Sequence, residues 1–542
     1  MNKMLSKTRS TRNIKPLIET LVGEHLVEKT TQPFLDQSSP EMPDRSEGSL
    51  RPTDLTESTE ADREALEALL PASGETFEYL LNSFAGYRGR RLKSALLLTT
   101  VWSVTGALHL VSWGIGIGAI GAIILGVHGF RAIATPQPKA RSGQRSPSSS
   151  PSGKVAESEA GISAITPPTI APNTPPLTQA HWPTVALLVA AKDEENVIGE
   201  TIEKLCELDF PLDRYEVWAI NDNSSDQTGA VLDQLTQRYA HLHVVHRGRD
   251  ASGGKSGALN LALQQIRMDI IGVFDADARV DPDFLQQVLP LFDRPEIGAV
   301  QVRKAITNAQ DNAWTKGQAI EMVLDSYLQG QRHVLGGIGE LRGNGQFVRR
   351  DALSRCGYFN EVTITDDLDL SLRLHLDGWD VRCTTWPAVY EEGVTTAIAL
   401  WHQRSRWAEG GYQRYMDYWR LLTSDRLSPM KRLDLMIFIG AQYLLPAAAI
   451  PDAIGAIACG HLPVWLPITL MSAVLTLSWI SCGLRRVAAE QGVSLSWTAA
   501  LAQAVRGTVY MLHWIVVMAA TTTRMAFRPK RLKWVKTVHR GA

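Results

Sequence analysis

The sequence predicts an α/β domain with a mostly parallel sheet, held between membrane-spanning helices. Strand-like and helix-like segments alternate over residues 184–293, and this alternation is typical of parallel sheets. Apolar segments with almost no charge, 94–130 and 435–484, lie on either side of that region. A spanning helix needs roughly 20 apolar residues. Each segment is therefore long enough for two spans.

Composition excludes several classes of function. The 542 residues carry a formal net charge of −1, so no basic field predicts a nucleic-acid partner. The five cysteines form no C-x-x-C pair, which argues against a zinc site or a disulfide framework and fits a reducing compartment. Residues 1–90 hold no apolar core segment, so we expect no cleavable signal peptide.

The N-terminal third is expected to hold one membrane element between polar segments. Residues 1–90 are rich in Glu, Ser, Thr, Asp and Pro, and we expect a disordered tail. Residues 93–132 are predicted to form a transmembrane hairpin, because the charge-free stretch is flanked by basic residues that favour the cytoplasm at both ends. The alternatives are one long tilted helix or a buried soluble hairpin. Residues 135–180 are Pro- and Ser-rich and predict a linker.

Residues 435–523 are expected to form C-terminal transmembrane helices. A break at 459–464 divides the first apolar stretch into two spans. A further apolar stretch, 508–523, precedes the basic tail 524–542. A third span would place this tail outside, against the positive-inside tendency. Either 487–505 pairs with 508–523 as a hairpin, or the last stretch lies in the membrane interface.

Acidic side chains gather at the expected ends of the predicted strands. The strands are expected at 184–191, 215–221, 241–247 and 269–277, each followed by a helix. Ligands of parallel sheets bind beyond the carboxyl ends of the strands. The acids at these positions are Asp193, Glu195, Asp222, Asp275 and Asp277.

The stretch RDASGGKSGALN, residues 249–260, looks like a phosphate-binding P-loop. A P-loop requires G-x-x-x-x-G-K-[ST]. The position six residues before Lys255 is Arg249, and Gly248 is one residue away from the required place. No convincing Walker B strand accompanies it. We therefore exclude an ATPase and expect Lys255 to lie near another phosphate.

The sequence FDADAR places Asp275 and Asp277 two residues apart. In an extended segment such side chains point the same way. Two hard oxygen ligands can hold Mg²⁺ or Mn²⁺ while diphosphate oxygens complete the octahedron. A solvated turn is the alternative interpretation for an isolated D-x-D pair.

Two later segments, 364–381 and 399–419, each allow both a catalytic and a purely structural interpretation. An acidic turn opens the amphipathic helix of residues 364–381, where Thr365 and the acids suit helix capping and one aspartate suits a general base. Residues 399–419 contain three Trp, three Tyr and three Arg. This composition is typical of a helix at the bilayer interface.

Together and in this order, these motifs resemble the inverting family 2 glycosyltransferases, a membrane class that includes cellulose and hyaluronan synthases. The resemblance covers about residues 180–425. Its acidic motifs appear in NDNSSD, FDADA and TDD, and its Q-x-x-R-W appears as QRSRW. It implies a Rossmann-like GT-A domain over 181–397 and an interfacial helix region over 398–425. Asp366–Asp367 stands where the family usually has Glu-Asp.

The resemblance also implies a role for each candidate residue. Asp367 would be the general base, and Asp275 and Asp277 would hold Mg²⁺ or Mn²⁺. The remaining candidates would bind the substrates: Asp193, Glu195 and Asp222 at the uridine, Lys255 near the diphosphate, Arg406 and Gln403 at the diphosphate, and Trp407 as a wall of the acceptor site.

The motifs SGGKSGALN and GELRGNGQFVRR resemble most closely the branch of oxygenic photosynthetic bacteria that glucosylates diacylglycerol. This implies UDP-glucose, diacylglycerol, Mg²⁺, a bilayer location with a cytoplasmic catalytic domain, and a plasma or thylakoid membrane. No protein partner is indicated. The alternatives are a processive β-glycan synthase and a non-catalytic membrane scaffold.

Overall fold

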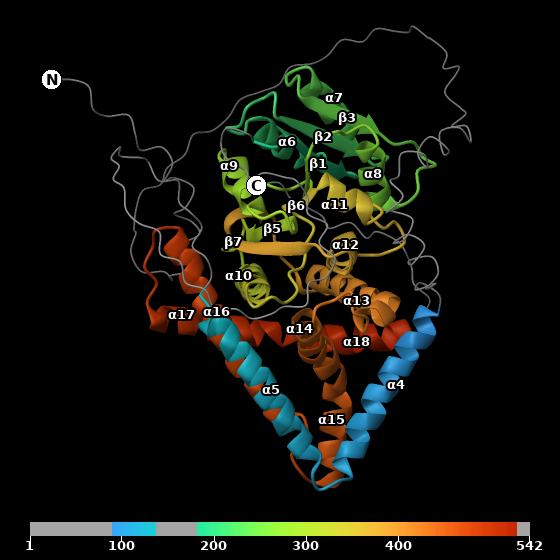
Figure 1. Ribbon diagram of the computed structural model, residues 1–542, viewed down its shortest axis with the longest axis vertical. Helices are drawn as coiled ribbons and strands as arrows, with labels where there is room; N and C mark the ends of the chain where they lie inside the picture. Colours follow the sequence, from blue (N-terminus) through green and yellow to red (C-terminus); the bar gives the residue numbers. More distant parts are fainter. Residues whose placement is uncertain (1–88, 137–181, 528–542) are drawn as a thin grey trace, which may run out of the picture.

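The computed structural model describes residues 89–136 and 182–527. The predicted tail 1–90, the linker 135–180 and the basic tail 524–542 fall almost wholly outside the described residues. The described chain folds into an α/β domain that stands on a V-shaped group of helices (Figure 1).

The centre of the α/β domain is a mostly parallel seven-stranded sheet in the order β3-β2-β1-β4-β6-β5-β7. The strands are β1 Val185–Ala191, β2 Tyr215–Asn221, β3 Leu242–His246, β4 Ile270–Phe274, β5 Ile297–Ile306, β6 Gln346–Arg349 and β7 Asp380–Glu391. Strand β6 runs antiparallel to β4 and β5, and the other pairs are parallel. The predicted α/β class and mostly parallel sheet are confirmed.

Helices cover the faces of this sheet and seal its core. They are α6 Ile198–Cys206, α7 Thr228–Thr236, α8 Gly254–Leu263, α9 Phe284–Val288 with the 3₁₀ turn η2 Leu289–Phe292, α10 Ala313–Val334, α11 Arg350–Arg355 and α12 Asp366–Leu376. Strand β1 is buried along its whole length and contributes alternate side chains to two hydrophobic clusters. A strand buried on both faces reads as a continuous apolar run, which is why VALLVAA was recognisable.

Long helices connect the domain to the apolar segments. They are α4 Arg90–His109, α5 Gly114–Ala134, α13 Ala397–Leu422, α14 Pro429–Ile439, a π-helical turn η3 Gly440–Leu444, α15 Leu445–Cys459, α16 Leu466–Glu490, α17 Trp497–Met511 and α18 His513–Phe527. Among the described residues, four helical stretches are long and apolar enough to cross a membrane: 114–134, 429–459, 466–490 and 497–527.

The charge-free N-terminal segment forms two helices, α4 and α5, with a turn between them. Helix α4 packs against α15, and α5 packs against α16. In Figure 1, α5 with α16 forms one arm of the V and α4 the other, while α15 descends between them, and all four helices meet at the tip. Glycines permit the close approach of α5 to the start of α16, because a Cβ at Gly118 would lie 2.1 Å from the carbonyl oxygen of Val464 in the turn before α16. Small residues have this role in membrane helix pairs.

Helices α17 and α18 run crosswise beneath the α/β domain instead of along an arm (Figure 1). Helix α18 packs against α4, α13 and α15. Arg91 at the start of α4 donates to the carbonyl oxygen of Ala526 across 3.3 Å. The end of α18 therefore lies beside the beginning of α4. This crosswise course favours the interface alternative for 508–523, while 497–527 is also apolar enough for a span; the orientation of this segment stays a prediction.

Candidate active site

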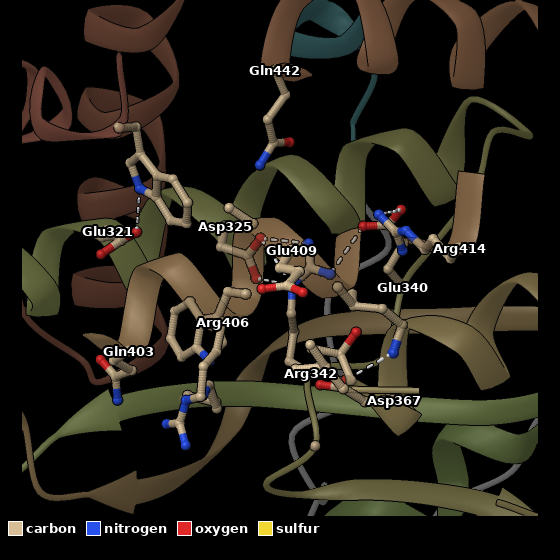
Figure 2. Close-up of a pocket in the computed structure, with 18 of the residues that line it drawn as sticks. Glu321, Asp325, Glu340, Arg342, Asp367, Gln403, Arg406, Glu409, Arg414 and Gln442 are labelled. Atoms are coloured by element: carbon tan, nitrogen blue, oxygen red, sulfur yellow. Dashed lines mark hydrogen bonds and ion pairs between the residues drawn. The ribbon is translucent and has the colours of Figure 1, made fainter. Parts of the chain in front are cut away.

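A cavity of about 1400 Å³ opens between the α/β domain and the helices below it. Most of the side chains singled out in the sequence line it: Lys255, Asp275, Asp277, Asp367, Gln403, Arg406 and Trp407. Figure 2 shows Asp367, Gln403 and Arg406 on one side of this cavity. Segments more than 100 residues apart in the sequence are thus brought to one site.

Asp275 and Asp277 lie just beyond β4, which ends at Phe274. The D-x-D pair therefore occupies the turn after the strand, whereas the sequence analysis expected the strand to continue over 269–277. The Asp275 carboxylate accepts from the Lys255 ammonium at 2.5 Å, and Asp277 accepts from the backbone N–H of Glu392 at 2.8 Å. Both carboxylates are held at the cavity by neighbouring segments.

These two carboxylates fit a divalent cation. Hard oxygen donors suit Mg²⁺, which is commonly held by one or two protein carboxylates together with substrate phosphates. Within residues 89–136 and 182–527, no group of three or more His, Cys, Asp or Glu side chains is arranged to hold a metal. The donor set of Asp275 and Asp277 is therefore sufficient only if a substrate supplies further ligands.

Lys255 belongs to the first turn of α8, where the chain follows two glycines of positive φ, Gly253 and Gly254. Gly253 has a φ of +79°, a conformation that residues with a Cβ rarely adopt, so this turn favours glycine. Burial opposes the charge of Lys255, but Asp275 and the acids of α12 outweigh it and raise the pKa of the ammonium. Lys255 stays protonated at neutral pH, beside the D-x-D pair.

Asp367 is in the first turn of α12 and faces the cavity. Its Oδ1 accepts from the Leu368 N–H at 2.8 Å. Burial and then the negative charge of Asp366 raise the pKa of Asp367 to about 6. Thr365 occupies the N-cap position without a side-chain capping bond. The Thr365 side chain therefore does not cap α12 as the sequence predicted. Asp367 has the properties of a base that is ionised near neutral pH.

Helix α13 carries the Q-x-x-R-W residues along the cavity wall. Gln403 accepts from Arg404 at 2.6 Å. The guanidinium of Arg404 lies 4.0 Å from the ring centroid of Trp407 and forms an ion pair with Glu321 at 2.5 Å. Burial lowers the pKa of Arg406 and the nearby Asp275 opposes this shift. Arg406 is therefore close to the D-x-D end of the cavity.

The three acids predicted at the uridine do not line this cavity. Asp193 accepts from the Ser225 N–H at 2.6 Å, and Glu195 accepts from the Gln227 N–H at 2.8 Å. These bonds join the loops that follow β1 and β2. A uridine contact remains a prediction for both residues.

Asp222 is buried and pairs with Arg247 at 2.5 Å. Arg247 also donates to the carbonyl oxygen of Gly254 at 3.0 Å. Asp222 thereby supports the glycine turn that presents Lys255. Its contact with uridine is also still a prediction. Glu194, which the sequence did not single out, lines the cavity in this region.

The sequence also gave no role to an ionic network in the cavity wall. Glu340 pairs with Arg342 at 2.9 Å and with Arg414 at 3.0 Å. Arg342 pairs with Asp325 at 2.8 Å. Burial alone would raise the pKa of Glu340, but the guanidinium groups around it outweigh burial and lower the pKa to about 2. Arg342 and Glu340 lie in the GELRGNGQ segment, whose alternating charges were the available signal.

Comparisons with known proteins place this site in a family. A family model described as glycosyltransferase like family 2 matches residues 183–410. The β-monoglucosyldiacylglycerol synthase of Trichormus variabilis is 51% identical over 84% of this chain and 90% of its own length. The enzyme of that name from Synechocystis is 48% identical over 89% of this chain and 96% of its own length. The chain belongs to the β-monoglucosyldiacylglycerol synthase family.

More distant matches are shorter. A poly-β-1,6-N-acetyl-D-glucosamine synthase of Staphylococcus epidermidis is 28% identical over 45% of this chain and 58% of its own length. Among solved structures, a mannosyltransferase from Pyrobaculum calidifontis, in complex with GDP-Man and Mn²⁺, aligns with a TM-score of 0.47 and 18% identity, over 76% of this chain and 99% of its own.

Proposed function

We propose that this protein transfers glucose from UDP-glucose to 1,2-diacylglycerol with inversion, forming β-monoglucosyldiacylglycerol. The observation that carries the proposal is the identity of about half of all residues with synthases of that product over most of both chains. The cavity supports it, because carboxylates suited to a metal, a base and a diphosphate site open toward apolar helices.

Asp367 is the base in this mechanism. The acceptor hydroxyl loses its proton as it attacks the anomeric carbon, and a carboxylate within hydrogen-bond reach takes that proton. With its pKa raised to about 6, Asp367 is largely ionised at pH 7 and is a stronger base than an ordinary aspartate. A single displacement on an α-linked donor gives a β-glucoside.

The opposite end of the cavity suits the leaving UDP. Asp275 and Asp277 would hold Mg²⁺, or Mn²⁺, and that ion neutralises diphosphate charge when bound. Lys255 remains protonated beside them and can contact a diphosphate oxygen. Arg406 can add a bidentate contact, with Gln403 beside it. Trp407 offers an indole face to the acceptor.

The placement at a membrane follows from the helices. We propose that the candidate spans and the crosswise helices α17 and α18 bring the cavity to the level of the lipid headgroups, on the cytoplasmic leaflet of the plasma or thylakoid membrane. Processive β-glycan synthesis is the alternative. It has weaker support, because the polysaccharide synthase relative matches less than half of this chain.

A membrane assay tests the proposal. The chain is expressed in a host without glucolipids, and membranes receive radiolabelled UDP-glucose, Mg²⁺ and diacylglycerol. We expect diacylglycerol-dependent label in the organic phase, as one sugar on lipid. Label in an aqueous or insoluble polymer would instead identify a polysaccharide synthase. Incorporation from UDP-galactose alone would overturn the donor assignment.

A further inference from the structure

The cavity extends well beyond the candidate catalytic residues into the space between the two arms of the V. Its volume of about 1400 Å³ exceeds the roughly 300–1,000 Å³ of ordinary small-molecule sites. Its far end is lined by apolar side chains from α5, α14, α15, α16 and α18: Leu125, Ile437, Phe438, Pro446, Leu475, Ile515 and Met518. One compartment therefore joins a charged end in the α/β domain to an apolar end between helices that are candidate membrane spans.

The cavity wall between these two ends carries charged side chains that form ion pairs with one another. Arg332 pairs with Asp434 at 2.9 Å, in addition to the pairs of Arg342 and Arg414 with Asp325 and Glu340. Further along, Arg524 pairs with Glu409 at 2.9 Å. All these residues line the cavity.

A lipid phosphate would have to separate one of these pairs, which is costly where charges are partly desolvated. An uncharged lipid alcohol requires no such separation. The pairing therefore favours a neutral headgroup in this part of the cavity.

One polar side chain of this wall has a distinctive backbone setting. Gln442 lies in the π-helical turn Gly440–Leu444, where the N–H of Leu445 bonds to the carbonyl oxygen of Gly440. Pro446 has no N–H to donate to the carbonyl of Gln442, so the regular α-helical bond at this point is impossible. Such π-turns are frequent at functional sites.

The Gln442 side chain is exposed and lines the cavity. Figure 2 shows it extending from the helix at the top of the view toward the side where Asp325 and Glu409 lie. Its amide offers both a donor and an acceptor, which matches the ester and hydroxyl groups of a glycerolipid.

We propose that the space between the two arms is the binding site of the acceptor lipid, that Gln442 hydrogen-bonds its glycerol ester region, and that the paired wall selects an uncharged headgroup. The inference rests on the proposed function and specifies how its acceptor is held. The acyl chains lie along the apolar end and the free hydroxyl points to Asp367. We assign this space to the acceptor because the same cavity continues to Asp367, the candidate base.

Photolabelling tests the location without requiring turnover. The full-length Asp367→Asn variant in lipid vesicles is irradiated with a diacylglycerol carrying a diazirine on one acyl chain. We expect label on the cavity-facing peptides around Leu125 and Leu475, reduced by excess unlabelled diacylglycerol and not by phosphatidic acid of the same chains. Label that excess diacylglycerol does not reduce would overturn the site. Equal competition by phosphatidic acid would overturn the selection of neutral lipids.

Kinetics test Gln442. In Gln442→Leu, of similar size and without hydrogen-bonding groups, we expect the KM for diacylglycerol to rise about tenfold, as for one lost hydrogen bond, while the KM for UDP-glucose stays unchanged. Gln264→Leu, on the exposed C-terminal end of α8, is the matched control. An unchanged KM for diacylglycerol would refute the role of Gln442.

The glucosylation assay and the photolabelling experiment together distinguish the proposed function from the proposed lipid site. If the wild-type chain makes no glucolipid yet shows competable labelling at the arms, the proposed function fails and the lipid site stands. If glucolipid forms while labelling is not competable, the proposed function stands and the site is refuted. If Gln442→Leu is inactive but is photolabelled to the same extent as Asp367→Asn, the variant has kept its fold and its lipid site. That result would refute a role of Gln442 that is limited to acceptor affinity.

Discussion

The pH dependence of turnover gives the sharpest test of Asp367. The pKa of its carboxyl, about 6, lies about two above the ordinary value near 4. A base works when deprotonated, so activity should fall as the pH falls through that value. About nine-tenths of the carboxyl is ionised at pH 7 and about one-tenth at pH 5. We therefore expect kcat/KM to fall about tenfold between these pH values.

The substitution Asp366→Asn tests why the pKa of Asp367 is raised. Asp366 raises the pKa of Asp367 through its negative charge, whereas burial is the larger cause and remains. The acid limb of the profile should therefore move to lower pH without reaching the ordinary value of aspartate. Asp367→Asn should remove turnover by at least about 100-fold and leave UDP-glucose binding intact.

The assay is initial glucosylation of diacylglycerol in vesicles from pH 4.5 to 8, at donor concentrations below KM. Enzyme returned to pH 7 after each low-pH exposure controls for unfolding. An acid limb that stays in place in Asp366→Asn would refute the electrostatic reasoning. Retained turnover in Asp367→Asn would refute the base assignment.

Four further predictions concern the metal, the donor and the packing. EDTA should abolish transfer and Mg²⁺ should restore it, whereas Asp277→Asn should not recover at equal Mg²⁺; cation-independent turnover would contradict the metal assignment. Lys255→Ala should raise the KM for UDP-glucose, and an unchanged donor KM would argue against its place at the diphosphate. Arg404→Ala leaves Glu321 buried without its cation and should lower the free energy of unfolding by about 3–5 kcal/mol, seen as a lower Tm in detergent. Gly118→Ala should also lower Tm, because its Cβ would meet the oxygen of Val464 at 2.1 Å; an unchanged Tm would show that α5 and α16 can separate at little cost.

Local features of the sequence were enough for the first half of the sheet and for much of the candidate site. Strands β1 to β4 were predictable because each is a short apolar run followed by a polar turn and a helix. The same pattern predicted Asp275 and Asp277 at the carboxyl end of the fourth strand, although β4 ends one residue before Asp275. Asp367 and the Q-x-x-R-W residues came from their order along the chain, by resemblance, and the structure lines them along one cavity.

Other features depend on contacts between distant segments. Strand β6 enters the sheet antiparallel between β4 and β5, a pairing that its four residues do not encode alone. Glu340 meets Arg414 only because α13 returns beneath the sheet. A buried carboxylate is stable there because cations from other elements surround it.

Hydropathy established that the C-terminal segment is apolar, since the free energy of transfer from water depends on composition. Composition does not determine how an apolar helix is oriented relative to the other helices. Helix α18 lies crosswise where α4, α13 and α15 offer it a packing surface, and α17 packs against α16 and α10. The sequence by itself thus predicted the first four strands, the apolar segments and the candidate residues for the chemistry. The tertiary structure alone decided how the arms diverge and where the cavity opens between them, because both follow from packing between elements far apart in the chain.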